Sequence, residues 1–256
     1  MMILPKPSTS AKLFLTGSTV GPLVDALHNQ CLLEYDILPI AISLPGSSSE
    51  TAPLLCTSWL IPPLLGVAYV VLGGILPRLF SLIVGNDGVG PTKLVEMNSM
   101  QLPPRERALA AVMSTALIIR LSEYLQTHSH MQYGNLNIAI MVAAAAAQWI
   151  TLDGTYTALI AAIVTAFGGP LSELPFVAAG CWHYIPQAAD YLPLSGLGST
   201  GTNTYSDLSQ LALSSITGPC YFAVTMDSIA LGRWFDNDDD VDDDSSGDVQ
   251  KRKSIF

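Results

Sequence analysis

The chain has 256 residues, of which half are hydrophobic and only 12% are charged, and its formal net charge is −10. A soluble domain of this length covers its surface with more polar and charged groups, and a mean hydropathy of +0.41 is too high for one. The composition therefore excludes the ordinary soluble classes and predicts a protein of the lipid bilayer.

Six apolar stretches along the chain are predicted to be transmembrane helices. At about 1.5 Å per residue, stretches of this length suit a hydrocarbon core of roughly 30 Å. The first is the weakest, because two glycines, Pro22 and Asp25 interrupt it. We expect an all-α membrane protein, a bundle of six transmembrane helices, with spans at residues 13–27, 53–76, 108–125, 136–152, 156–171 and 208–231.

The basic residues predict the orientation of the bundle. Ten of the 11 Lys and Arg residues precede the first span, lie between the second and third, or follow the sixth: Lys6, Lys12, Arg78, Lys93, Arg105, Arg107, Arg233, Lys251, Arg252 and Lys253. By the positive-inside rule, both termini are cytoplasmic. The exception is Arg120, near the outer end of the third span. It either extends to the interface or pairs with Glu123 at i+3, or else it is a buried functional charge.

The two ends of the chain lie outside the predicted six-helix domain of residues 13–235. Residues 1–12 form a short cytoplasmic N-terminus. Residues 236–256 are predicted to be a disordered acidic cytoplasmic tail, because Asp236 to Asp248 holds eight aspartates in thirteen residues and has little apolar surface to bury. A calcium loop is the alternative, but the glycine and glutamate that an EF-hand requires are absent from their positions.

Polar residues within the predicted spans are few, and none forms a familiar catalytic motif, so we expect no enzymatic activity and no catalytic residues. Asp25 and His28 lie at i and i+3 on one helix face, as a mutually satisfied polar pair or as part of a ligand or proton site. Asp227, in the sixth span, either reaches the cytoplasmic interface or is a functional charge.

Asp153 follows the fourth predicted span. The segment Trp149 to Thr155 is compatible with a tight cytoplasmic turn, in which Asp153 is the N-cap of the fifth helix and Gly154 adopts a positive φ. A functional role for Asp153 is the alternative. The alanines Ala143 to Ala147 and those at 158, 161, 162 and 166 give the two flanking helices smooth faces for close helix packing, within this chain or with another protein.

The four cysteines are Cys31, Cys56, Cys181 and Cys220. Their spacing contains no CxxC or Cys/His pattern, so we expect no metal site. The first three fall on or near the non-cytoplasmic side, where a disulfide is permitted but not required.

Several segments, taken in order, resemble the Insig (insulin-induced gene) proteins of the endoplasmic reticulum membrane. The resemblance covers about residues 12 to 235. Its segments are Trp59 to Gly66, Gly73 to Pro77, Trp149 to Asp153, Gly180 to Tyr184, Pro219-Cys220 and Gly232-Arg233.

The resemblance implies a sterol-responsive binding protein in the endoplasmic reticulum membrane. Insig proteins retain sterol-sensing-domain partners, namely Scap and HMG-CoA reductase, and oxysterol occupies a membrane pocket formed with the partner. The family's Asp at the end of the fourth span, needed for partner binding, corresponds to Asp153, with Trp149 beside it. The family's basic residue after that Asp is replaced by Gly154, which removes one source of ion pairs with a partner.

From the resemblance we expect a sterol or other lipid ligand, no other cofactor and no nucleic-acid partner. Two other functions remain open. One is a lipid-binding membrane protein without a protein partner, which shares only the fold. The other is a small transporter or channel subunit that uses Asp25, His28 and Asp227, although the two halves of the chain show no evident inverted repeat.

Overall fold

The computed structural model describes residues 4–29, 32–42, 55–84, 102–128, 134–191 and 211–253, and in these ranges the chain is mostly helical. The helices are α1 (Pro7–Asn29), α2 (Ile61–Tyr69), the π-helix η1 (Val70–Ile75), α3 (Leu76–Val84), α5 (Pro104–His128), α6 (Gly134–Leu152), α7 (Tyr156–Ala178) and α9 (Thr217–Lys253). The strands are β1 (Leu33–Tyr35), β2 (Pro39–Ile42), β3 (Leu55–Ser58) and β4 (Trp182–Tyr184). Because α2, η1 and α3 are continuous, the described residues form six helical units.

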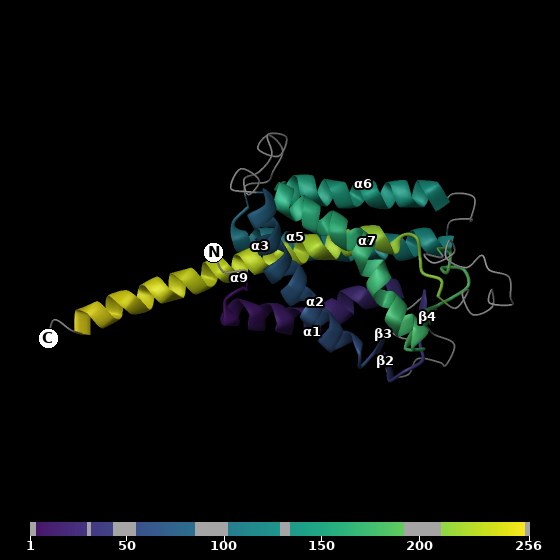
Figure 1. Cartoon of the computed structure of the whole chain (residues 1–256), viewed down its shortest axis with the longest axis horizontal. Coiled ribbons are helices and arrows are strands. Elements are labelled where there is room, and N and C mark those ends of the chain that lie inside the picture. Colours follow the sequence, from purple (N-terminus) through teal and green to yellow (C-terminus); the bar gives the residue numbers. More distant parts are fainter. Residues whose placement is uncertain are drawn as a thin grey trace.

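Helix α9 runs through the middle of the bundle, and its C-terminal part extends beyond it (Figure 1). It packs against α1, η1, α5, α6 and α7, and Ala223, Met226 and Ile229 on it are almost fully buried. We call the end of the bundle that holds the start of α1 and the α6–α7 turn the termini end. The opposite end, which carries the strands, is the strand end. Successive helical units run alternately between these two ends (Figure 1). Their order along the chain agrees with the predicted order of the spans.

The second predicted span, residues 53–76, begins too early and ends too early. Residues Leu55–Ser58 form β3, which pairs with β2, and the helical unit runs from residue 61 to 84. Pro62 and Pro63 lie in its first turn, where their missing N–H groups have no intrahelical acceptor to lose. Further along, the backbone takes π-helical bonds, with Leu76 N–H donating to Val71 O, just before Pro77. The helix therefore continues past Pro77 to Val84, eight residues beyond the predicted end of the span.

Helix α9 also differs from the prediction. The span predicted at 208–231 begins at Thr217, and the tail predicted to be disordered from residue 236 continues the helix to Lys253. Extending an existing helix avoids the unfavourable nucleation step, so composition alone did not decide the backbone conformation. The fifth helix likewise runs to Ala178 and not to residue 171, and the first begins at Pro7, inside the predicted N-terminus.

Two glycines let η1 and α9 cross at close range. A Cβ on Gly73 would meet the backbone oxygen of Ser228, and a Cβ on Gly232 would meet that of Gly73. Small residues are the usual means by which membrane helices approach at backbone distance. Part of the segment Gly73 to Pro77, and the Gly232-Arg233 pair, thus form one helix crossing.

The strand end is closed by two short antiparallel pairs, β2 with β3 and β1 with β4. In the second pair Tyr35 lies opposite Trp182, and Glu34 lies opposite His183. Because side chains alternate along a strand, the aromatic residues are buried while Glu34 and His183 are exposed. This pair therefore presents an aromatic inner face and a charged outer face.

Large apolar side chains are exposed along the helices, among them Phe167 (74% exposed), Ile83 (72%) and Leu117 (69%). Four helical segments are long and apolar enough to cross a membrane: 61–84, 104–128, 135–152 and 156–178. Such an apolar exterior is unusual for a soluble monomer and suits contact with lipid.

Candidate lipid pocket, polar cavity and the turn at Asp153

The α6–α7 turn is held by a network centred on Asp153, which is 8% exposed. Its Oδ1 accepts hydrogen bonds from the backbone N (2.9 Å) and the Oγ1 (2.5 Å) of Thr155, and its Oδ2 forms an ion pair with Arg233 of α9. Gly154 has φ +69°, as the predicted turn requires. The N-cap of α7 is Thr155, whose hydroxyl accepts from Ala158 N, so the assignment of the cap to Asp153 was wrong by two residues.

Arg233 belongs to a run of four residues that joins α9 to the other elements at the termini end. Besides the Asp153 pair, Arg105 of α5 lies over the Trp234 ring at 6.0 Å, and Lys12 of α1 lies over the Phe235 ring at 5.8 Å. The fourth residue, Asp236, pairs with Arg78 of α3 and accepts a hydrogen bond from Thr9 Oγ1 at 2.7 Å. We call residues 233–236 the anchor segment.

Trp149 connects this turn to a large apolar pocket. Its Nε1 donates to Thr155 O at 3.1 Å, while the residue also lines a pocket of about 700 Å³ between α6, α7 and α9. Val142, Ile163, Phe167 and Phe222 contribute to the same lining. Of these, Phe167 is among the most exposed side chains of the bundle surface, so the pocket opens toward the lipid. Its volume lies within the usual range for small-molecule sites.

The strand end of the same pocket is polar. Ser214, Ser215 and Tyr191 line it there. Ser215 Oγ donates to Asp190 Oδ2 at 2.8 Å, whereas the buried Ser214 Oγ has no hydrogen-bond partner among the described residues. An unsatisfied buried hydroxyl is unfavourable by about 1–3 kcal/mol. The Ser214 Oγ has no surface open to the pocket, so the hydroxyl groups that line this end for a ligand are those of Ser215 and Tyr191.

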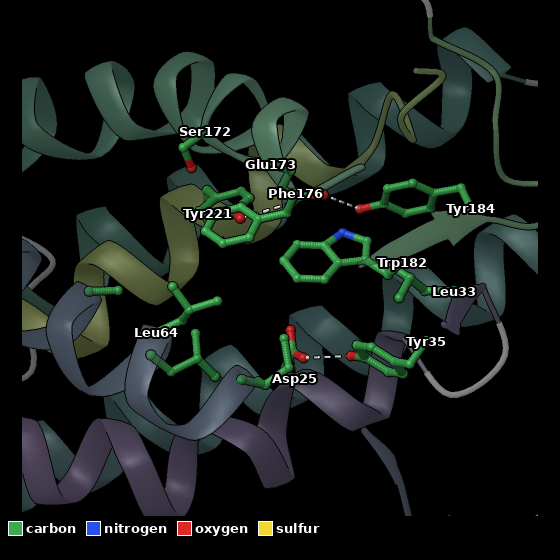
Figure 2. A pocket seen from close by; sticks show the side chains of 13 residues that line it. Asp25, Leu33, Tyr35, Leu64, Ser172, Glu173, Phe176, Trp182, Tyr184 and Tyr221 are labelled. Atoms are coloured by element: carbon green, nitrogen blue, oxygen red, sulfur yellow. Dashed lines mark hydrogen bonds between the residues drawn. The ribbon is translucent and has the colours of Figure 1, made fainter. Parts of the chain in front are cut away.

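A second, smaller cavity of about 170 Å³ lies at the strand end. Asp25 of α1 lines it and accepts a hydrogen bond from Tyr35 at 3.4 Å. Glu173 of α7 lies across the cavity from this pair, with the indole of Trp182 between them (Figure 2). The predicted intramembrane polar site at Asp25 therefore coincides with a cavity.

Glu173 accepts hydrogen bonds from two tyrosines, Tyr184 at 2.9 Å and Tyr221 at 2.8 Å. Burial raises the pKa of Tyr184 well above its ordinary value, so its phenol stays protonated and can donate to the carboxylate. A Cβ at Gly169 would strike the ring of Tyr221, and the glycine therefore makes room for that ring beside Glu173.

The remaining polar residues are distributed over the bundle. His28 is buried, with Nδ1 2.7 Å from Ser122 Oγ on α5, so it faces that helix while Asp25 faces the cavity. Asp227 is fully buried, near Tyr69 and Ser228, and does not reach the interface. Arg120 pairs with Glu123 at 2.7 Å, as the i+3 spacing predicts.

The cysteines that the structure describes are free. Cys56 is half-buried, and Cys181 and Cys220 are buried. Cys31 lies outside the described residues. The permitted disulfide is thus not formed between Cys56 and Cys181.

Two side chains of the candidate sites, Glu173 and Arg233, were not named as site residues by the sequence analysis. Glu173 was counted as a loop residue because the fifth span was ended at residue 171. An acidic residue inside an apolar helix is a recognised signal of function. If the predicted span had extended to Ala178, Glu173 would have been identified by this signal. Arg233 was counted only as a topological charge, since no sequence rule pairs it with a residue 80 positions away.

No family model and no curated protein matches the sequence. Two crystal structures match the fold. The first is a mycobacterial Insig homolog, MvINS from Mycobacterium vanbaalenii, with a TM-score of 0.57 and 19% identity, covering 90% of this chain and 95% of that chain. The second is a cross-linked MvINS trimer, with a TM-score of 0.58, 20% identity and the same coverages.

The chain has an Insig-like fold. With four helices apolar enough to span a bilayer, it is a multi-pass membrane protein. At this identity the likeness concerns the Insig-like fold alone.

Proposed function

We propose that this protein is a sterol-responsive regulatory protein of the endoplasmic reticulum membrane. It spans the membrane six times with both termini in the cytoplasm, binds a sterol or related lipid, and retains membrane proteins that contain a sterol-sensing domain. It acts by binding and not by catalysis. The observation that carries the proposal is the Insig-like fold over 90% of the chain, together with an apolar pocket that is polar at one end.

The pocket supports a sterol as the ligand class. From Ile138 to Trp149 its lining follows α6 over twelve residues, a rise of about 16 Å at 1.5 Å per residue, which suits an elongated apolar body. Ser215 and Tyr191 supply hydroxyl groups at the strand end of the pocket. An apolar ring system that carries a hydroxyl at one end satisfies both features.

The contacts of Trp149 connect the ligand pocket with the surface proposed to bind a protein partner. The residue lines the pocket and donates to Thr155, which in turn hydrogen-bonds to Asp153. A ligand that fixes the Trp149 ring thereby fixes the α6–α7 turn. The proposed partner surface is this turn, with Asp153 and Trp149 as its recognition residues.

Capture of a sterol-sensing-domain protein from detergent extracts, with and without added oxysterol, tests this proposal. Wild-type protein is expected to recover the partner in an oxysterol-dependent manner, and Asp153→Asn to lose it at normal expression. Recovery of lipid with no such partner would instead favour a lipid-binding protein without a protein partner. Equal capture by wild type and Asp153→Asn would contradict the role of Asp153.

Arg233→Gln shows how Asp153 acts in this assay. If Asp153 shapes the turn through its ion pair, Arg233→Gln weakens capture as much as Asp153→Asn. If the Asp153 carboxylate itself contacts the partner, Arg233→Gln leaves that carboxylate available and capture persists. Glu34→Gln, at the strand end, is the control that should capture normally.

A further inference from the structure

The small cavity at the strand end is walled by aromatic rings. Tyr35, Phe176, Trp182, Tyr184 and Tyr221 all line it. Trp182 stacks on Phe176 with ring centroids 5.0 Å apart and meets Tyr35 edge-on at 6.4 Å, which holds its indole in one orientation. Rings held in this way offer negatively polarised faces to a cation, and Trp is the strongest of them.

Two carboxylates lie on opposite sides of these rings. Asp25 comes from α1 and Glu173 from α7, with Trp182 between them (Figure 2). A carboxylate can accept about four hydrogen bonds or charge contacts, so a hydrogen bond from a tyrosine does not by itself prevent Glu173 or Asp25 from attracting a positive group. Among the described lining residues no side chain is basic.

The outer face of the same strand pair is also acidic. Glu34 and Asp36 are exposed on either side of Tyr35, and His183 lies within 3.5 Å and 2.9 Å of them. Strand alternation places these acids outside the aromatic residues that line the cavity. A negative surface around an opening raises the local concentration of cations and their rate of entry.

Size and lining narrow the chemistry of the cation. A volume of about 170 Å³ corresponds to roughly six water molecules at 30 Å³ each, which admits a small headgroup and excludes the body of a sterol. A metal ion requires several oxygen ligands in a shell, and the described residues contain no cluster of three or more His, Cys, Asp or Glu that could hold one. Aromatic walls with two separated carboxylates suit an organic cation whose charge is spread over a larger group.

We propose that this cavity binds an organic ammonium group, such as the quaternary ammonium of choline, free or as a lipid headgroup. Asp25 and Glu173 balance its charge, and the ring of Trp182 contacts its methyl groups. This site is separate from the apolar pocket, and its occupancy does not depend on the function proposed above.

The test compares choline with 3,3-dimethylbutan-1-ol, a neutral molecule of nearly the same shape in which carbon replaces nitrogen. Calorimetric titration into the purified full chain in nonionic detergent should show saturable binding of choline and little binding of the alcohol. Equal binding of the two, or no binding of choline in any form, would overturn the proposal.

Substitutions locate the binding. Asp25→Asn, which keeps an acceptor for Tyr35, should weaken choline binding about tenfold or more, as should Trp182→Leu. Glu34→Gln, on the outer face, should change the affinity by no more than about twofold. Choline binding by Asp25→Asn equal to that of wild type would place the ammonium elsewhere.

Native mass spectrometry distinguishes the source of the ammonium. Protein extracted from bilayers of phosphatidylcholine and phosphatidylglycerol should retain phosphatidylcholine, displaceable by free choline, if the ligand is a lipid headgroup. If the ligand is a free ammonium compound, choline should bind, and adding it should not displace either lipid from the protein. Either result supports the ammonium site.

Discussion

Arg233 of α9 forms an ion pair with Asp153 in the α6–α7 turn, 80 residues earlier in the chain. The Asp153 side chain is 4% exposed and the Arg233 side chain 36%, so the pair lies at the edge of the bundle with its carboxylate turned inward. The guanidinium also donates to Thr155 Oγ1 at 3.1 Å. The turn proposed to meet a partner is thereby fixed to the central helix.

A double-mutant cycle on this pair should reveal a large coupling. Asp153→Asn, Arg233→Gln and the double variant should give an interaction free energy of about 1.5–3 kcal/mol, because the hydrogen bonds are charged and the carboxylate is buried. The measurement is thermal unfolding in detergent. The same cycle on Arg120 and Glu123, whose arginine is 55% exposed, should give about 1 kcal/mol or less. Equal coupling in the two pairs would contradict this account of the turn.

The crossing of η1 and α9 should not tolerate a methyl group. Gly73→Ala and Gly232→Ala place a Cβ against a backbone oxygen, so each should destabilise the protein by about 1–3 kcal/mol. Gly168→Ala is the matched control, because nothing lies within 4 Å of its Cβ. Since Ala favours helix more than Gly does, that variant should be neutral or slightly stabilised in the same melting experiment. A similar loss in all three variants would refute the close-crossing explanation.

The acidic tail should contribute to stability only through its first residue. Asp236 pairs with Arg78 and Thr9, so Asp236→Asn should lower the melting temperature, with a loss of about 1–2 kcal/mol. Asp238→Asn, two residues on and exposed, should have no effect. Truncation after Asp238 should change the free energy of unfolding by no more than about 0.5 kcal/mol, because the removed segment is too acidic to form a core. A large fall on truncation would show that the remaining tail also docks.

Sequence patterns predicted the helices better than their ends. Apolar runs gave the number and order of the helical units, because burial in lipid leaves a strong compositional signal. The second span was misplaced since Leu55 to Ser58 is as apolar as a helix start, and short apolar runs do not distinguish strand from helix. The predicted span also ended at residue 76, whereas the π-helical turn before Pro77 carries the helix on to Val84.

The site could be predicted only where residues lie near one another in the chain. The turn at Asp153 and the pairing of Arg120 with Glu123 follow from local spacing. The contacts of Asp153 with Arg233, and of Glu173 with Tyr184 and Tyr221, join distant segments, and no alternation or spacing rule reports them. Asp25 was named because a charge inside a span is unfavourable unless it has a use, and the structure places it on the wall of a cavity.

The orientation remains a prediction, and glycosylation mapping tests it. Basic residues gather at the termini end, so that end should face the cytoplasm. An acceptor placed in residues 196–202, which lie outside the described residues, should be glycosylated in microsomes, and one placed after residue 248 should not. Modification of the tail acceptor would reverse the topology.

Photoaffinity labelling with an oxysterol probe tests the central claim most directly. Ala146→Phe fills the apolar pocket, which Ala146 lines, whereas Ala147→Phe adds the same bulk at an exposed position on the same helix. Purified wild-type protein and Ala147→Phe should show saturable labelling that unlabelled oxysterol removes, and Ala146→Phe should lose about 90% of it. Labelling of Ala146→Phe at the wild-type level, or no competable labelling of the wild type, would contradict the claim that this pocket binds a sterol.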